Sequence, residues 1–167
     1  MPSHNTFSIA PISKFVGKYL SLSKRSIDPF ARDFQGATIT NDMNPETLAE
    51  YHEKALDFLQ RFVDSEPFDL VIFDPPYSLG QVKEMYSNMG IEKLSMKEAQ
   101  NTGRWSPEKD TIDKILRPGG IVLHFGWHTN GMGKKRNYEI VEILLVAHGS
   151  AHNDTICMAE RKLKGLF

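Results

Sequence analysis

The fold of this chain is decided by the stretch Phe68-Asp69-Leu70-Val71-Ile72-Phe73-Asp74-Pro75-Pro76-Tyr77. Residues 68–73 are rich in β-branched and aromatic side chains, which predicts a buried β-strand. Prolines donate no backbone hydrogen bond to a neighbouring strand, so the strand must end before Pro75 and Pro76. We therefore expect a carboxylate, Asp74, at the carboxyl end of a buried strand, followed by a rigid loop.

Other short apolar runs show the same behaviour. Three further strands are expected, each beside polar or turn residues: 26–27 before Asp28-Pro29-Phe30, 36–40 before Asn41-Asp42, and 121–125 after the turn 117–120. Near the end of the chain, residues 139–147 and 154–161 are strand-like and flank a turn-rich segment. This pair predicts an antiparallel hairpin.

Two helices are expected between these strands. After Asn44-Pro45, a suitable N-cap and first helical residue, apolar residues at helical spacing predict one continuous helix: Leu48, Tyr51, Ala55, Leu59 and Phe62. A second helix, over residues 106–116, begins at Ser106-Pro107-Glu108 and stops before Pro118-Gly119.

The alternation of strands and helices predicts an α/β fold with a mainly parallel sheet and an antiparallel C-terminal hairpin. The segment 29–38 is too short for a crossover helix, so the sheet is expected to be truncated. A length of 167 residues suits a single domain over residues 1–167. Ligands of such sheets bind beyond the carboxyl ends of the strands, which places Asp28, Asp42 and Asp74 along one edge.

Composition narrows the class of partner. The formal net charge is −1, but residues 38–78 alone carry −7. That acidic segment suits a cationic or zwitterionic cofactor, whereas the basic run Lys134-Lys135-Arg136 suits phosphates or is simply solvated. The single cysteine, Cys157, reads as a small buried residue, and no Cys/His cluster has metal-ligand spacing. Without a signal peptide or a membrane-length apolar run, a cytoplasmic protein with no membrane or metal function is expected.

The residues after the decisive strand suit the chemistry of an aromatic amine. Such a nitrogen is a poor nucleophile because its lone pair is delocalised into the ring. The carboxylate of Asp74 and the carbonyl of Pro75 could each accept one N–H and bias the nitrogen toward a tetrahedral form. Pro75 and Pro76 would fix the loop, and Tyr77 would stack on a base turned out of its helix. The plainer alternative is a rigid turn that ends the strand.

Residues 68–78 resemble motif IV of the amino-methyltransferases, in the DPPY form typical of enzymes acting on N6 of adenine. Residues 116–122 are similar to the turn before the fifth strand of that fold, and residues 26–31 and 39–46 resemble its motifs I and II. The tail, residues 126–157, resembles the small DNA adenine methyltransferases of bacteriophages. The resemblance implies a Rossmann-like fold, S-adenosylmethionine as cofactor, DNA as partner and the cytoplasm of a bacterial or phage-infected cell.

The resemblance also assigns site residues. The residues expected at the cofactor are Asp28, Pro29, Phe30, Asp42, Met43 and Asp74, with Asp42 on the ribose hydroxyls. The residues expected at nucleic acid are Lys134, Lys135, Arg136, His152 and Asn153. His124 is expected to be a partly buried structural residue, and Trp127 either a pocket wall or core. The family further implies a short strand near 49–52 and a helix from Ala55, against the single helix above.

Other substrates and roles remain open at this point. RNA, cytosine N4 or a glutamine side chain would use the same reaction, although Asp rather than Asn at position 74 disfavours glutamine by analogy. A catalytically inactive binding subunit is a third hypothesis, because the expected glycine-rich loop carries only Gly36. No insert is long enough for a separate target-recognition domain, so a homodimer is one arrangement that would enlarge the DNA-binding surface.

Overall fold

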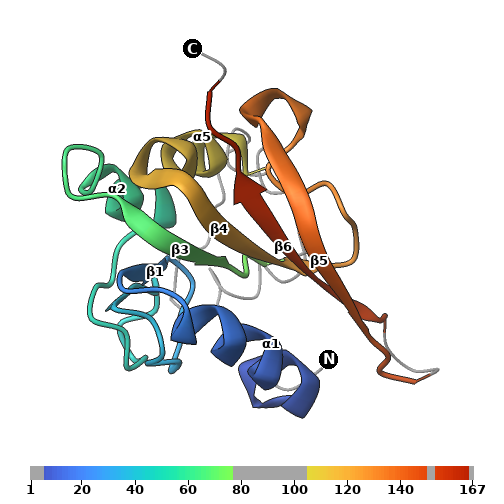
Figure 1. Ribbon diagram of the computed structural model, residues 1–167. Helices are drawn as coiled ribbons and strands as arrows, with labels where there is room; N and C mark the ends of the chain where they lie inside the picture. Colours follow the sequence, from blue (N-terminus) through green and yellow to red (C-terminus); the bar gives the residue numbers. More distant parts are fainter. Residues whose placement is uncertain (1–5, 77–104, 150–152, 166–167) are drawn as a thin grey trace, which may run out of the picture.

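The computed structural model describes residues 6–76, 105–149 and 153–165. These residues form a six-stranded sheet in the order β2-β1-β3-β4-β6-β5 (Figure 1). The strands are β1 (Ser26–Asp28), β2 (Ile39–Thr40), β3 (Phe68–Phe73), β4 (Leu116–Gly126), β5 (Tyr138–Val146) and β6 (Thr155–Lys162). Strands β1 to β4 pair in parallel, and β6 runs antiparallel between β4 and β5. The predicted α/β class with an antiparallel C-terminal hairpin is confirmed.

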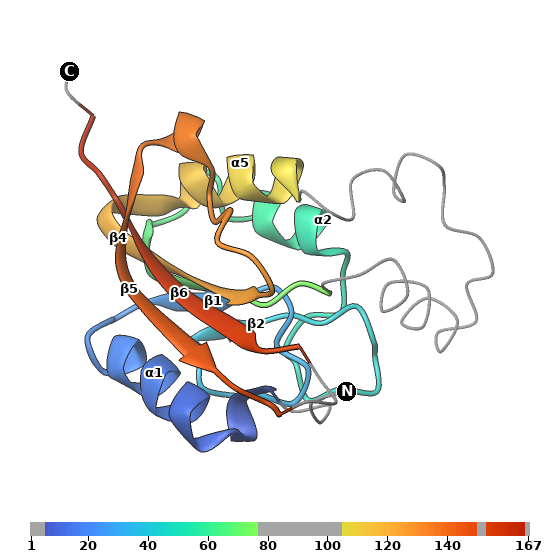
Figure 2. The ribbon, with the colours of Figure 1, turned by 90° about the vertical axis from the view of Figure 1, so that its right-hand side faces the viewer.

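Helices cover both faces of the sheet. Helix α1 (Ala10–Ser21) lies on one face, and α2 (Ala55–Gln60) and α5 (Ser106–Ile115) lie on the other (Figure 2). Two short 3-10 helices, η1 (Thr6–Ser8) and η2 (Lys134–Arg136), complete the described elements. Alternate residues of β3 enter the two cores: Leu70 and Ile72 pack with α1, whereas Val71 and Phe73 pack with α2 and α5. Burial on both faces explains why the strand is almost continuously apolar.

Helix α1 was not predicted, although its sequence carries a signal. Its buried residues recur at helical spacing behind Pro11, and they are Ile12, Phe15, Val16 and Tyr19. The helix is tied to β5 through one carboxylate, because Lys18 Nζ and Tyr19 Oη each lie 2.6 Å from Glu142 Oε2. Helix α1 is thus anchored on the edge strand of the sheet.

The single helix predicted from Leu48 to Phe62 is wrong. Helix α2 begins only at Ala55, and Tyr51 instead forms an isolated parallel bridge with Asn41. The Asn41 side chain accepts the Glu53 N–H at 2.9 Å and donates to the Glu53 carbonyl at 3.0 Å. These bonds hold residues 51–53 extended beside β2, as the family resemblance implied.

Asn44 is consequently not the N-cap of that helix. Its Oδ1 accepts the Glu46 N–H at 3.0 Å in a local turn. Leu48, which the helical pattern would have buried, is 66% exposed.

Two strand boundaries also differ from the prediction. β2 covers Ile39–Thr40 rather than residues 36–40. At residue 38, the Thr38 N–H donates to the Ser26 hydroxyl at 2.9 Å and the Ser26 N–H donates to the Thr38 hydroxyl at 3.1 Å, in place of strand pairing. The predicted turn 117–120 belongs to β4, whose pairing with β3 is irregular between Phe68 and Leu70. The short segment 29–38 contains no helix, as expected. In the described part of the chain, no helix has the length and apolarity needed to span a bilayer.

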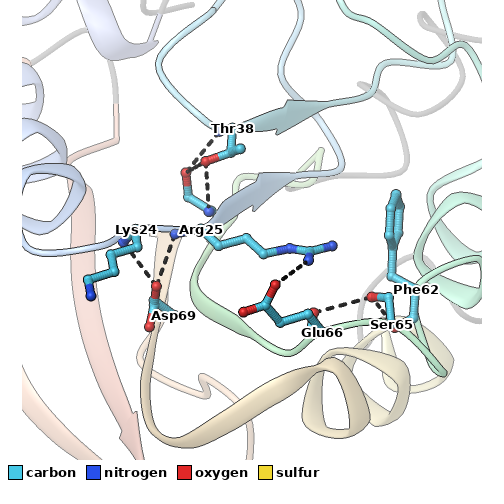
Figure 3. Close-up of polar contacts among 8 residues, drawn as sticks. Lys24, Arg25, Thr38, Phe62, Ser65, Glu66 and Asp69 are labelled. Carbon is cyan, nitrogen blue, oxygen red and sulfur yellow. Dashed lines mark hydrogen bonds and ion pairs between the residues drawn. The ribbon is translucent and has the colours of Figure 1, made fainter.

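Asp69 binds the start of β3 to the end of the loop before β1 (Figure 3). Its Oδ2 accepts the backbone N–H groups of Lys24 and Arg25 at 2.9 Å each, and its Oδ1 accepts Arg117 Nε at 2.5 Å. Burial by itself would raise the pKa of Asp69, but the bonds from Arg117, Lys24 and Arg25 outweigh it and lower that pKa. The ionised carboxylate therefore stabilises the fold.

Asp69→Asn is expected to lower the free energy of unfolding by roughly 1–2 kcal/mol at about pH 7, since it removes a charged acceptor. Because the folded-state pKa is depressed, this contribution is present above the ordinary carboxyl pKa and lost as the pH falls through the folded value. Urea titrations at about pH 7 and about pH 3 should show the difference shrink.

Glu66→Gln is the matched control, because the Glu66 carboxylate is 82% exposed and its distance to Arg25 Nη1 is as long as 3.5 Å. We expect this exposed ion pair to contribute almost nothing to the free energy of unfolding. Equal losses in the two variants would contradict the role given to Asp69.

Candidate active site

Three carboxylates gather at the carboxyl ends of the first three strands. Asp28 ends β1, Asp42 follows β2, and Asp74 follows β3. The charges of Asp74 and Asp42 both raise the pKa of Asp28. Asp74 also acts on Cys157, a buried thiol whose pKa burial and this carboxylate raise to about 12. The structure therefore brings the three predicted acids together at one edge of the sheet.

Asp28 is the most unusual of these acids. It is completely buried, and its Oδ1 accepts the Phe30 N–H at 2.9 Å. Its Oδ2 is buried without a hydrogen-bond partner among the described residues. Burial raises the pKa of Asp28 well above its usual value, against the bond from Phe30. A buried oxygen left unpaired costs free energy, so this atom is a candidate ligand acceptor.

Asp42 is held by the backbone around it. Its Oδ1 accepts the Asn44 N–H at 2.9 Å, and its Oδ2 accepts the Arg32 N–H at 3.2 Å. Burial raises the pKa of Asp42, and these two bonds partly oppose the change. Each carboxylate oxygen has a second lone pair, so both can still accept a hydroxyl.

The other predicted cofactor residues have mixed surroundings. Pro29 is buried, and its carbonyl accepts Asn41 Nδ2 at 3.1 Å, which locks the loop after β1 to β2. Phe30 is half-buried, with ring centroids 5.6 Å from Phe73 and 5.2 Å from Trp105. Met43 is half-buried.

A pocket opens at the ends of β3 and β4. Its walls are mainly apolar and aromatic, with a few basic side chains, and its lining residues are Phe73, Pro75, Pro76, Trp105, Lys109, His124, Phe125, Gly126, Trp127, His128 and Gly131. Pro75 is buried and Pro76 half-buried, so the loop after Asp74 forms part of the wall. Trp127 is 44% exposed, which places this residue on the pocket wall rather than in the core.

Two charged residues at or behind the pocket were missed by the sequence analysis. Lys109 lies on α5, and Glu160 lies behind the pocket, with Oε2 at 2.8 Å from His124 Nε2. Glu160 is only 6% exposed, although glutamate is rarely buried. Its place directly after the apolar run 156–159 was the available signal.

The residues predicted at nucleic acid lie in two places. Arg136 is tied to α5 by bonds from Nε and Nη2 to Asp110 Oδ1 at 2.9 and 2.7 Å, so much of its hydrogen-bonding capacity is used within the protein. Lys135 and Asn153 are exposed, and Lys134 starts η2. Tyr77 and His152 fall outside the described residues, as does the side chain of Lys134.

Comparison with solved structures identifies the fold. The N-methyltransferase NodS from Bradyrhizobium japonicum, solved with S-adenosyl-L-homocysteine, has a TM-score of 0.58 at 16% identity, over 97% of this chain and 90% of NodS. TrmN from Thermus thermophilus has a TM-score of 0.57 at 14% identity, over 88% of this chain and 48% of TrmN. NSun6 from Pyrococcus horikoshii, solved with SFG, has a TM-score of 0.57 at 14% identity, over 92% of this chain and 52% of NSun6.

The chain therefore has the Rossmann-like fold of the S-adenosylmethionine-dependent methyltransferases, as predicted. It spans about half the length of TrmN and NSun6. The sequence matches no protein-family model and no curated protein.

Asp28→Asn is expected to raise the melting temperature of the ligand-free protein at about pH 8 and to change it little at about pH 4. Because the folded-state pKa of Asp28 is raised, its contribution to stability is lost as the pH rises through that value. The amide carries no charge and avoids this loss. Asp64→Asn, at an exposed turn, is the control and should leave the pH dependence unchanged. A lower melting temperature for Asp28→Asn than for the wild-type protein at about pH 8 would contradict the destabilising effect assigned to the ionised, buried Asp28 carboxylate.

Proposed function

We propose that this protein transfers a methyl group from S-adenosylmethionine to an exocyclic amino nitrogen, most specifically N6 of adenine in DNA. One observation carries the proposal. Asp74 follows β3, next to β1 with its Asp28, on which the charges of both Asp74 and Asp42 act, and the prolines after Asp74 line an aromatic pocket. A methyl donor and an acceptor base would need that adjacency.

The residues at the acidic edge fit the cofactor. The unpaired Oδ2 of Asp28 offers a buried acceptor to a cationic group, and Asp42 offers two oxygens to ribose hydroxyls. Phe30, Pro29 and Met43 complete this side of the proposed site. When bound, S-adenosylmethionine supplies a methyl group on a sulfonium, which is activated toward a nitrogen nucleophile.

The Asp74 loop would orient the amine. The Asp74 carboxylate and the Pro75 carbonyl each accept one N–H of the NH2 group, so that the nitrogen lone pair is turned out of the ring plane. Neither proline has an N–H that would compete for these acceptors. Holding amine and methyl in line accounts for most of the rate acceleration, and no nucleophilic side chain is needed.

The pocket walls would hold the base. Trp105 and Trp127 offer rings for stacking, a contact worth about 1–3 kcal/mol for a base on an aromatic side chain. Tyr77, which the family resemblance places on the base, lies outside the described residues. DNA as the substrate rests on the resemblance of residues 68–78 to the DPPY methyltransferases, and exposed Lys135 and Asn153 are proposed to contact its backbone.

Asp74→Ala is expected to reduce methyl transfer by on the order of 100-fold or more, because the amine loses one of its two acceptors. The measurement is transfer of tritium from labelled S-adenosylmethionine to DNA, RNA, free nucleotides and protein, compared side by side. We expect DNA to be labelled, and specifically at N6 of adenine.

Asp64→Asn serves as the control for activity, and circular dichroism melts would show that Asp74→Ala still folds. Wild-type activity in Asp74→Ala would contradict the catalytic role proposed for Asp74. Label in RNA or on cytosine N4 would show that the substrate differs from the one proposed. The rival role, an inactive binding subunit, would be supported by calorimetry that detects no binding of S-adenosylmethionine to the wild-type chain.

A further inference from the structure

The pocket contains a buried histidine that has no role in the methyl transfer proposed above. His124 lies on β4, is only 8% exposed and lines the pocket. Its ring packs edge-on against Phe73, at a centroid distance of 5.7 Å and an angle of 77°. The imidazole is thus fixed beside the strand that carries Asp74.

A second buried group holds the imidazole from behind. Nε2 of His124 lies 2.8 Å from Oε2 of Glu160, but the contact is not aligned as a hydrogen bond and leaves Nε2 without a hydrogen-bond partner in the described part of the chain. Glu160 Oε2 also accepts the Met132 N–H at 2.7 Å. This buried carboxylate is therefore fixed as well.

The backbone near Glu160 is shaped around the carboxylate. Gly131 has a φ of +47°, and a Cβ at this position would lie 2.2 Å from Glu160 Oε2. Any side chain at residue 131 would displace the carboxylate from His124. The positions of His124 and Glu160 are therefore fixed by the surrounding fold, unlike those of two side chains that meet on the surface.

An imidazole has two ring nitrogens, and Glu160 faces only Nε2. Nε2 is the ring nitrogen that is buried without a hydrogen-bond partner, whereas Nδ1 is not among the buried unpaired atoms of the described residues. A doubly protonated imidazole carries an N–H on both nitrogens, so it can form a charged pair with Glu160 through Nε2 and donate a hydrogen bond to a ligand from Nδ1. The acceptors that flank the amino group of an adenine are its ring nitrogens N1 and N7.

We propose that His124, oriented by Glu160, is a specificity-determining residue that donates a hydrogen bond to a ring nitrogen beside the amino group of the substrate base. The inference rests on the proposed function, which places a base in this pocket. It adds direct recognition of the heterocycle to the grip of Asp74 and Pro75 on the amine. A side-chain amide such as glutamine has no ring nitrogen and is discriminated against.

Binding of the base is then linked to uptake of a proton. Burial lowers the pKa of His124 in the empty pocket, Glu160 opposes this effect, and Lys109 of α5 and His128 after β4 reinforce it. A ring nitrogen that accepts from the imidazolium favours the charged form. Affinity for the base therefore decreases as the pH rises from about 6 to about 8.

The test is binding of a fluorescent single strand with one adenine among thymines, measured by anisotropy at constant salt. A single strand avoids the cost of flipping the base. Strands with 1-deazaadenine or 7-deazaadenine in place of adenine lack one ring acceptor each. Wild-type protein should bind one of them about 10-fold or more weakly than adenine. His124→Phe should bind all three alike, and Glu160→Gln should retain only part of the discrimination.

His148→Phe is the matched control, because His148 lies in the hairpin and bonds Thr155 Oγ1 there. It should keep the wild-type ratios. Equal wild-type affinities for all three strands, no binding of any strand, or unchanged discrimination in folded His124→Phe and Glu160→Gln would overturn the inference. Since binding is measured without the cofactor, absence of methyl transfer would instead count against the proposed function.

Discussion

The burial of β3 on both faces is the constraint on which the rest of the molecule depends. The strand lies inside the sheet, between β1 and β4, and its alternate side chains enter the two cores. A strand of this kind has one register compatible with both cores, because a shift by one residue would exchange every side chain between the faces. The position of Asp74 is therefore determined by packing that extends well away from the pocket.

Because β1 to β4 are parallel, their carboxyl ends meet at one edge of the sheet, where the candidate site has an acidic side and a side with basic residues. The carboxyl ends of β1, β2 and β3 bring acids together, and burial, followed by the charges of Asp74 and Asp42, raises the pKa of Asp28. Across the Asp74 loop, β4 and α5 supply His124 and Lys109 to the pocket. One side of the candidate site is thus acidic, and the other is mainly aromatic with a few basic side chains. The proposed methyl donor and the proposed acceptor base each match one of these two sides.

The sequence was most informative where local signals and burial agree. β3, α5 and the C-terminal hairpin were predicted to within a few residues, because prolines, turns and apolar runs mark their ends. The prediction of a helix over residues 48–62 was wrong because the Asn41 side chain holds residues 51–53 extended. Hydrophobic periodicity carries no information on such a contact between residues distant in the sequence. Glu160 was missed for a related reason, since only the strands on either side of β6 show that the residue is enclosed.

The anchoring of α1 on Glu142 also constrains how the chain reaches its final form. Lys18 and Glu142 are separated by 124 residues in the sequence, and Tyr19 and Glu142 by 123. During synthesis, α1 leaves the ribosome long before β5 exists, so its apolar face can pack on β3 before its polar contacts with Glu142 can form. The polar attachment of α1 to the sheet is therefore a long-range contact that can form only once β5 is in place.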